Sequence, residues 1–414
     1  MALTLEEKAK VLAKEHAGVK KIALSFSGGL DSAVVGMLLQ EAGFSILPVT
    51  VNIGQHSDFS QIAKNAKKMF GASVVADFRD DFSANVFRAI KANFGLDGNM
   101  STGGLSRPSF ARALSEAARK GKCQAIAHGS SGTGNDHLTM ENSLRVLAPD
   151  MRIIAPVRDL DMRRDEALEY ARKNNLPTNM ERAQHYSVDE NLLARTIRQG
   201  AALDPGHSLP EDAYKWTVSP QNAPNVPANV SIEFENGMPK AISIEGKKFA
   251  DGPSMIEKLN EIGGKHGVGR VDWLDDKVVG LKIREVYECP GARMLLKAHR
   301  ELESITLTTK ELDVKGYIDG LWNRLVHDGG WHTRLRRGLD AFIDETQRAV
   351  DGVVDLQLYK GSIVVKGRKS KHALYDTRLS GRGKDAMFSQ KEARYFAKLY
   401  GMQDVIAYVM DVDS

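Results

Sequence analysis

The segment Ser25–Ser32, with the sequence SFSGGLDS, carries the strongest chemical signal in this chain. It follows the apolar run Lys21–Phe26, which we expect to be a strand, and it opens Asp31–Ala42, which we expect to be a helix. The start of a helix presents unpaired N–H groups and the positive end of the helix dipole. Two glycines let those amides approach an anion without a Cβ in the way, and Ser27 and Ser32 add hydroxyl donors. The segment therefore predicts a phosphate-binding loop.

This loop differs from the two commonest phosphate motifs. It matches neither GxxxxGK[ST] nor GxGxxG. It also contains no lysine that could contact a γ-phosphate. The alternative to phosphate binding is a purely structural role, in which the segment is a helix cap after a glycine turn. The placement between a strand and a helix favours phosphate binding, with Asp31 either capping the helix or helping to hold a magnesium ion.

The motif SGGLDS resembles the pyrophosphate loop of ATP pyrophosphatases, which cleave ATP between its α- and β-phosphates. Further segments resemble argininosuccinate synthases in the same order and spacing, and on them the chain is identified as a member of that family. These segments are GGLSRP, AHGSSGTGND, IAPVR, YSVDENL, HGVGRVD, VYECPG, AHRELE and LYKGSIVVKGRKS.

The resemblance implies an ATP-dependent carbon–nitrogen ligase. In this family a ureido oxygen attacks the α-phosphorus of ATP and releases pyrophosphate. The amino group of L-aspartate then displaces AMP from the adenylated carbon. Such catalysis depends mainly on positioning the reactants and stabilising charge.

The resemblance also implies roles for individual residues. The ATP site comprises Leu24, Ser25, Phe26, Ser27, Gly28, Gly29, Asp31, Ser32, Val51 and Gly129. The aspartate site comprises Ser131, Asn135, Asp136 and Arg107, and the acceptor site comprises Asn99, Gly103, Gly104, Thr139, Ser187, Thr196, Asp275 and Tyr287. The catalytic candidates among them are Asp31, Ser32, Asn135 and Asp136. Magnesium would arrive with ATP, because the protein alone supplies no metal-ligand set.

Structural alternatives stay open for three of these predictions. Asn135 and Asp136 fit a turn pair that caps a helix. Tyr287 fits a packing aromatic between strands, and Arg107 fits a surface ion pair.

The acceptor side departs from the family pattern. Family members carry a tyrosine at Asn99, threonine and serine at Gly103 and Gly104, an arginine at Thr139 and a glutamate at Asp275. The tyrosine and arginine grip the α-carboxylate and amine of citrulline, and a threonine cannot replace an arginine fork. These changes predict a larger, less cationic pocket. Our hypothesis is a paralogue that uses a different ureido or amide-like acceptor.

Three other functions remain as alternatives. Citrulline itself stays open if Arg112, Arg145 or His137 restores the carboxylate contact. A tRNA-modifying enzyme of the same superfamily would favour a basic surface or paired cysteines, whereas the net charge is +4 and Cys123 and Cys289 lie far apart in the sequence. A non-catalytic nucleotide sensor is disfavoured by the complete loop motif.

The 414 residues predict two domains and a tail. Alternating strands and helices over 1–175 indicate a doubly wound parallel sheet that binds ATP. Residues 176–366 would form an α+β synthetase domain, and 367–414 a helical oligomerisation arm that resembles the arm tying this family into homotetramers. The N-terminus lacks a signal peptide pattern, and no apolar run approaches a membrane span. We therefore expect a cytoplasmic enzyme with small-molecule substrates and no nucleic-acid or membrane partner.

Within this frame the pattern predicts individual elements. It places a helix at Pro108–Lys120, a hairpin at Val230–Phe234 and Ala241–Ile244, and a strand at Lys277–Glu288. The glycines of Asn260–Gly269 predict a tight segment dominated by backbone.

Overall fold

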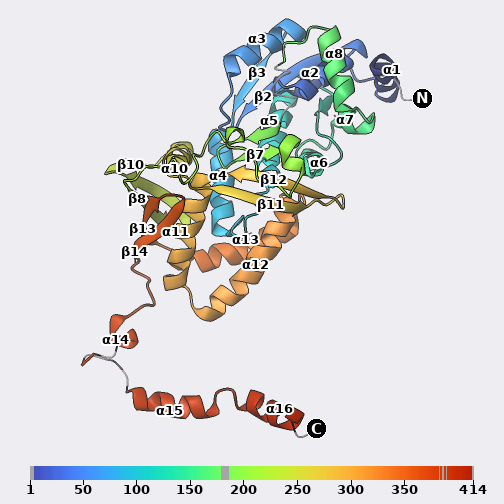
Figure 1. Ribbon diagram of the computed structural model, residues 1–414. Coiled ribbons are helices and arrows are strands. Elements are labelled where there is room, and N and C mark those ends of the chain that lie inside the picture. The colour runs from blue at the N-terminus through green and yellow to red at the C-terminus, as the bar shows by residue number, and fades with distance from the viewer. Residues whose placement is uncertain (1–3, 179–185, 382, 385–386, 388, 413–414) are drawn as a thin grey trace.

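A computed structural model describes residues 4–178, 186–381, 383–384, 387 and 389–412 (Figure 1). Its first part is built on a parallel sheet with the strand order β3-β2-β1-β4-β5. The strands are β1 (Lys21–Ser25), β2 (Ser45–Asn52), β3 (Val74–Asp77), β4 (Ala125–Ala127) and β5 (Arg152–Ile154). The helices are α1 (Leu5–Glu15), α2 (Leu30–Glu41), α3 (Phe59–Phe70), α4 (Arg79–Lys91), α5 (Thr102–Lys120), α6 (Asp136–Leu147), α7 (Pro156–Asp159) and α8 (Arg164–Lys173).

Strand β1 is buried on both faces, which is why its sequence is a continuous apolar run. Ile22 and Leu24 join one hydrophobic cluster with α1, α2 and α8. Ala23, which points to the opposite face, belongs to a second cluster with α4 and α5. Helices on both faces of a parallel sheet define a doubly wound α/β fold, so the predicted fold class is confirmed.

The second part contains two antiparallel sheets. One has the order β11-β12-β7-β6, with β6 (Ser187–Glu190), β7 (Arg195–Arg198), β11 (Arg270–Asp276) and β12 (Lys282–Glu288). The other has the order β10-β9-β8-β13-β14, with β8 (Ala228–Glu235), β9 (Met238–Ile244), β10 (Lys247–Phe249), β13 (Gly352–Tyr359) and β14 (Ser362–Lys369). The associated helices are η1 (Gly200–Leu203), η2 (Glu211–Ala213), α10 (Gly252–Lys265), α11 (Pro290–Thr306), α12 (Thr309–His327), α13 (Arg334–Thr346) and η3 (Gln347–Ala349).

The interpretation of Asn260–Gly269 as a tight segment is wrong for its first half, because α10 continues to Lys265. The glycines serve close packing instead. A Cβ on Gly263 would lie 2.7 Å from the Cβ of Pro290, and one on Gly264 would lie 2.0 Å from the Trp216 carbonyl oxygen. The absent side chains therefore let neighbouring segments touch the helix backbone.

The helix predicted at Pro108–Lys120 and the strand predicted at Lys277–Glu288 begin at other residues than predicted. Helix α5 starts at Thr102 and contains Pro108, where we had placed its first turn. The stretch from Lys277 is first a turn, closed by a hydrogen bond from the Lys277 N–H to the Leu281 carbonyl, and β12 begins only at Lys282.

The C-terminal segment leaves the body of the molecule after β14 (Figure 1). It carries α14 (Thr377–Ser380), α15 (Gln390–Leu399) and α16 (Met402–Val412). Large apolar side chains on this arm are exposed, among them Phe396, Leu399, Ile406 and Val409. Among the described residues, no helix is long and apolar enough to cross a membrane.

Candidate functional site

The predicted phosphate loop lies at the carboxyl end of β1, in the centre of the parallel sheet. The strand order reverses between β1 and β4, so the loops after these two strands leave the sheet on either side of one crevice. Gly129, in the loop after β4, approaches this point closely. A Cβ on Gly129 would lie 3.6 Å from the carbonyl carbon of Asp31 and 3.7 Å from the Ser32 nitrogen.

Backbone geometry in the loop depends on its two glycines. Gly28 has a φ of +75°, in the left-handed region that favours glycine, and Gly29 is the N-cap of α2. No side chain caps this helix, so its first N–H groups keep their bonding capacity. The hydroxyls of Ser27 and Ser32 lie 3.1 Å apart, and Ser32 Oγ donates to the Gly29 carbonyl at 3.0 Å. Such an arrangement suits an anion that bonds amides and hydroxyls together.

The neighbouring strand fixes the loop from one side. The Phe26 N–H donates to the Val49 carbonyl at 2.9 Å, and Thr50 Oγ1 donates to the Phe26 carbonyl at 2.8 Å. Leu24 and Val51 are buried in the core, so a nucleotide could contact their backbone atoms but not polar groups on their side chains.

Asp31 lies in the first turn of α2, and its burial raises the pKa of the carboxyl group, an effect that Arg164 partly counters. Among the residues that the structure describes, no three His, Cys, Asp or Glu side chains gather as metal ligands. Magnesium is commonly held by one or two carboxylates together with substrate phosphates. Asp31, in the first turn of the helix that follows the loop, is a carboxylate that could serve this role.

Asn135 is the N-cap of α6, yet its side chain does not cap the helix. Its Oδ1 accepts a hydrogen bond from the Val278 N–H at 2.9 Å, and its Nδ2 lies 3.1 Å from Nε2 of His327. The capping alternative therefore fails for this side chain. Asn135 instead joins the first part of the chain to the hairpin turn after β11 and to the end of α12.

Asp136 and Arg107 face each other beside Asn135. Arg107 lies 3.1 Å from Asp136 and 2.7 Å from Asp189, and only 13% of its side chain is exposed, so it is not a surface ion pair. Burial would raise the pKa of Asp136, but Arg107 and Arg198 outweigh this effect and hold its pKa well below the usual range. Ser131, in the same loop, contacts the Thr133 hydroxyl at 3.0 Å instead.

The predicted acceptor residues of the second part share one face of the β11-β12-β7-β6 sheet. In its register, Thr196 lies opposite both Asp189 and Tyr287. Because side chains alternate between faces, Ser187 and Arg198 lie on the same face two positions away. Thr196 Oγ1 is 3.2 Å from Thr102 Oγ1, which joins this face to the start of α5.

Tyr287 is fully buried, and its hydroxyl donates to Glu285. Burial and the Glu285 carboxylate raise the pKa of this tyrosine well above its usual value. Tyr287 is therefore a neutral donor that is anchored to a carboxylate, and not simply a packing aromatic.

Asp275 is the centre of a second polar cluster. It accepts from Asn99 Nδ2 at 3.0 Å, from Lys277 at 2.6 Å and from His327 at 3.1 Å. Burial would raise the pKa of Asp275, but His327 and Lys277 outweigh it and place the pKa well below the usual range. Burial lowers the pKa of His327, whereas Asp275 and Asp328 outweigh that effect and raise it.

The predicted enlargement of this pocket relative to the family, and its lower positive charge, stay predictions. The cavity between these elements has a volume of about 20 Å³, little more than the space of one water. A Cβ on Gly103 would lie 2.4 Å from Asp136 Oδ1, and one on Gly104 would lie 2.7 Å from the Val326 carbonyl oxygen. Neighbouring groups thus fill the volume that the glycines release. Arg198 and Lys277 both line the cavity.

Thr139 does not direct its hydroxyl into this cavity. Its Oγ1 donates to the Asn135 carbonyl at 3.2 Å and to the Asp136 carbonyl at 3.1 Å, and the residue is buried. Two of the three residues proposed as substitutes for the family arginine are engaged elsewhere, whereas Nδ1 of the buried His137 has no hydrogen-bond partner among the described residues. Arg112 pairs with Asp81 at 2.5 Å, and Arg145 pairs with Glu141 at 2.6 Å.

Sequence reasoning missed five polar residues that the structure brings into the site: Asp189, Arg198, Lys277, Glu285 and His327. Three of them stand two positions from a predicted residue on the same strand, so a period-two pattern would have found them. Lys277 lies in a turn and His327 ends a helix, and neither position carries such a signal.

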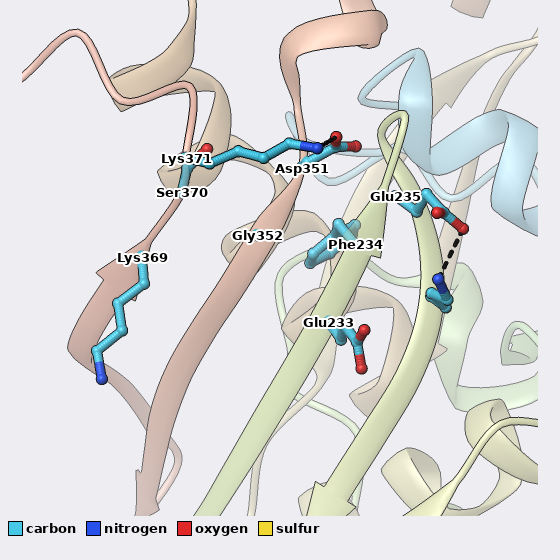
Figure 2. Close-up of a pocket in the computed structure, with 9 residues that line it drawn as sticks. Glu233, Phe234, Glu235, Asp351, Gly352, Lys369, Ser370 and Lys371 are labelled. Carbon is cyan, nitrogen blue, oxygen red and sulfur yellow. Dashed lines mark ion pairs between the residues drawn. The ribbon is translucent and has the colours of Figure 1, made fainter.

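A second hollow lies away from this site, at the end of the other antiparallel sheet where the arm begins. It has a volume of about 370 Å³ and is lined by Phe234, Gly352, Ser370 and several charged residues. Figure 2 shows Lys371 reaching toward Asp351, which lies 3.5 Å away. No predicted site residue lines this hollow.

Comparisons with known proteins cover nearly the whole chain. The model of the arginosuccinate synthase N-terminal HUP domain matches residues 21–177, and that of the arginosuccinate synthase C-terminal domain matches residues 186–407. The argininosuccinate synthase of Pyrococcus furiosus is 43% identical over 396 residues, which cover 94% of this chain and 95% of the relative. The enzyme of the same name from Methanopyrus kandleri is 41% identical over 394 residues, which cover 94% of this chain and 99% of the relative.

Proposed function

Because the chain belongs to the argininosuccinate synthase family, we propose that it joins L-aspartate to a ureido acceptor, converting ATP to AMP and pyrophosphate. The reaction class is that of an ATP-dependent, AMP-forming carbon–nitrogen ligase. The observation that carries the proposal is the meeting of the Ser25–Ser32 loop and the loop before Asn135 at one crevice. The loop amides would hold the phosphates, and Asn135 and Asp136 would lie beside the reacting carbon.

The proposed reaction has two displacements. The acceptor ureido oxygen forms a bond to the α-phosphorus, and the bond to the bridging oxygen breaks with loss of pyrophosphate. The aspartate nitrogen then bonds the ureido carbon, and the carbon–oxygen bond breaks to release AMP. Positioning dominates such catalysis, and holding both reactants is worth about 7–11 kcal/mol in favourable cases. Magnesium held by the phosphates and Asp31 would offset phosphate charge.

We further propose that the preferred acceptor is a ureido compound other than citrulline. The support is local: Asn99 bonds Asp275, and Thr139 bonds its own helix. Arg112 and Arg145 are committed to other carboxylates. Citrulline is the alternative, which the names of the relatives favour.

The test measures pyrophosphate and AMP release by the purified protein with ATP and L-aspartate, with and without citrulline. The ligase proposal expects AMP and pyrophosphate with a suitable acceptor; ADP and phosphate would refute it. A kcat/KM for citrulline of about 10⁴ M⁻¹s⁻¹ or more would refute the non-citrulline proposal and leave the ligase intact. Asp31→Ala serves as the inactive control.

We also propose three structural units, 1–175, 176–366 and 367–414, and a homotetramer joined through the last of them. The many exposed apolar side chains of α15 and α16 support this, since apolar surface gathered on one segment marks an interaction site. Removal of residues 371–414 should give monomers in light scattering. A truncated protein that keeps the mass of four chains would refute the role of the arm.

A further inference from the structure

The charged groups around the small cavity are already paired with one another. Arg198 Nε lies 2.9 Å from Glu285, and its other nitrogens lie 3.6 Å from Asp136 and 3.9 Å from Asp189. Arg107 pairs with the same two aspartates at 3.1 and 2.7 Å. Both arginines thus meet carboxylates on more than one side.

Lys277 is satisfied in the same way. Its ammonium group lies 2.6 Å from Asp275 and 2.8 Å from Glu285, and 8% of its side chain is exposed. His327 is held between Asp275 at 3.1 Å and Asp328 at 2.7 Å, and Asp328 also pairs with Arg324 at 2.9 Å.

Among the residues that the structure describes, every cation of this cluster is paired, so none is left over for another anion. Three permanent cations, Arg107, Arg198 and Lys277, face four carboxylates, those of Asp136, Asp189, Asp275 and Glu285. A charged His327 would only bring the two totals level. L-aspartate carries two carboxylates and one amino group, so its binding beside Asp136 would leave the cluster still less able to accept a carboxylate from the acceptor. A buried anion without a cationic partner is strongly disfavoured.

The direction of the acceptor follows from the reaction. Its ureido oxygen must meet the α-phosphorus near the Ser25–Ser32 loop, and the proposed acceptor residues Gly103 and Gly104 line the cavity beside Asn135, so we place the rest of the molecule there. The cavity beyond Asn135 is the one lined by Gly103, Gly104, Arg198, Lys277 and Glu285. The remote end of the acceptor therefore enters the paired charge cluster, whose side chains must part to admit it.

We propose that the acceptor is a ureido compound with no carboxylate at its remote end. This inference rests on the proposed ligase function and specifies its substrate class. Uncharged or amine-bearing ends add no anion to the cluster, whereas a carboxylate would need a cation that is already shared between two carboxylates.

Four probes with one carbon chain test the inference. They are citrulline, 5-ureidopentanoate, N-carbamoylputrescine and N-butylurea, whose remote ends are zwitterionic, anionic, cationic and neutral. We expect the better substrate of N-carbamoylputrescine and N-butylurea to have a kcat/KM at least about tenfold above that of citrulline or 5-ureidopentanoate. The affinities of the four probes, measured as Kd in the presence of a non-hydrolysable ATP analogue, should rank in the same way. Preference for citrulline or 5-ureidopentanoate, or failure of all four to bind, would overturn the inference.

The same assay separates this inference from the ligase proposal. AMP and pyrophosphate formation with citrulline as the best probe would refute only the acceptor class. ADP formation would refute the ligase itself.

Glu285→Gln supplies a second readout, because Glu285 is shared by Arg198 and Lys277. Removing its charge should raise the kcat/KM ratio of 5-ureidopentanoate to N-butylurea by about tenfold. Asp275→Asn, which takes one carboxylate from Lys277 and His327, should shift the ratio in the same direction and serves if the first variant does not fold. An unchanged ratio in a folded variant would contradict the charge argument.

Discussion

Gly28→Ala tests whether the loop backbone itself performs the phosphate chemistry. Gly28 has a φ of +75°, and a Cβ there would lie 3.0 Å from Ile62 Cγ1. The left-handed conformation costs a residue with a side chain about 1–2 kcal/mol. Gly71, the C-cap of α3, is a matched control because its φ is +74° and a Cβ on it would meet nothing within 4 Å. Both variants should therefore lose about 1–2 kcal/mol of unfolding free energy.

The two variants should differ in activity. Relief of the strain at Gly28 moves the neighbouring amides, and loss of one positioned donor costs about 10²–10³ in rate. We expect kcat/KM for ATP to fall by about 100-fold or more in Gly28→Ala and to stay within about twofold in Gly71→Ala, with urea unfolding measured on both. A Gly28→Ala enzyme with wild-type kcat/KM and reduced stability would refute the reasoning.

Four further predictions concern other parts of the chain. Burial raises the pKa of Glu141, but His128, whose Nε2 lies 3.6 Å away, and the hydrogen bond from Arg158 outweigh it and lower the pKa to about 2. The ionised carboxylate therefore stabilises the fold above about pH 4.5, and about 3 kcal/mol of unfolding free energy is lost as the pH falls toward 2. In Glu141→Gln, the free energy of unfolding measured with urea should therefore change less between these pH values. Burial raises the pKa of Cys289 to about 12, so a thiol reagent at pH 8 should leave it unlabelled until urea is added; rapid labelling of the native protein would contradict this burial. Gly103→Ala should push Asp136 from Arg107 and raise KM for aspartate about tenfold, unlike Gly320→Ala, which meets open space; equal KM values would disprove the contact. Asn99→Tyr with Thr139→Arg should raise kcat/KM for citrulline about tenfold in a folded protein, and no gain would count against the acceptor argument.

Much of the first part could be predicted from the sequence because its signals are local. The apolar run of β1, the two glycines and the following amphipathic helix are adjacent in the chain, and they lie adjacent in the structure. The prediction of a tight segment at Gly263 and Gly264 is wrong for the opposite reason. These positions need glycine because Pro290 and Trp216, which are distant in the sequence, pack directly against them.

The acceptor side was only half predictable. Ser187, Thr196 and Tyr287 gather on one sheet face, as the resemblance implied for a shared role. The size of the cavity could not be predicted, because Asp136, which is distant in the sequence, occupies the space beside Gly103. The net charge of +4 likewise says nothing about a local cluster in which carboxylates outnumber permanent cations.

The side chain of Asn135 is held at both ends by residues that follow it by well over a hundred positions. Its oxygen is fixed by the Val278 N–H, and its nitrogen by His327. A chimera could combine the first half of a relative with the second half of this chain. It would then place the relative's side chain at position 135 against the Val278 turn and the His327 helix end of this chain. If Asn135 faces the acceptor as proposed, the orientation of that amide depends on both halves of the chain, and a change on one side of it calls for a matching change on the other.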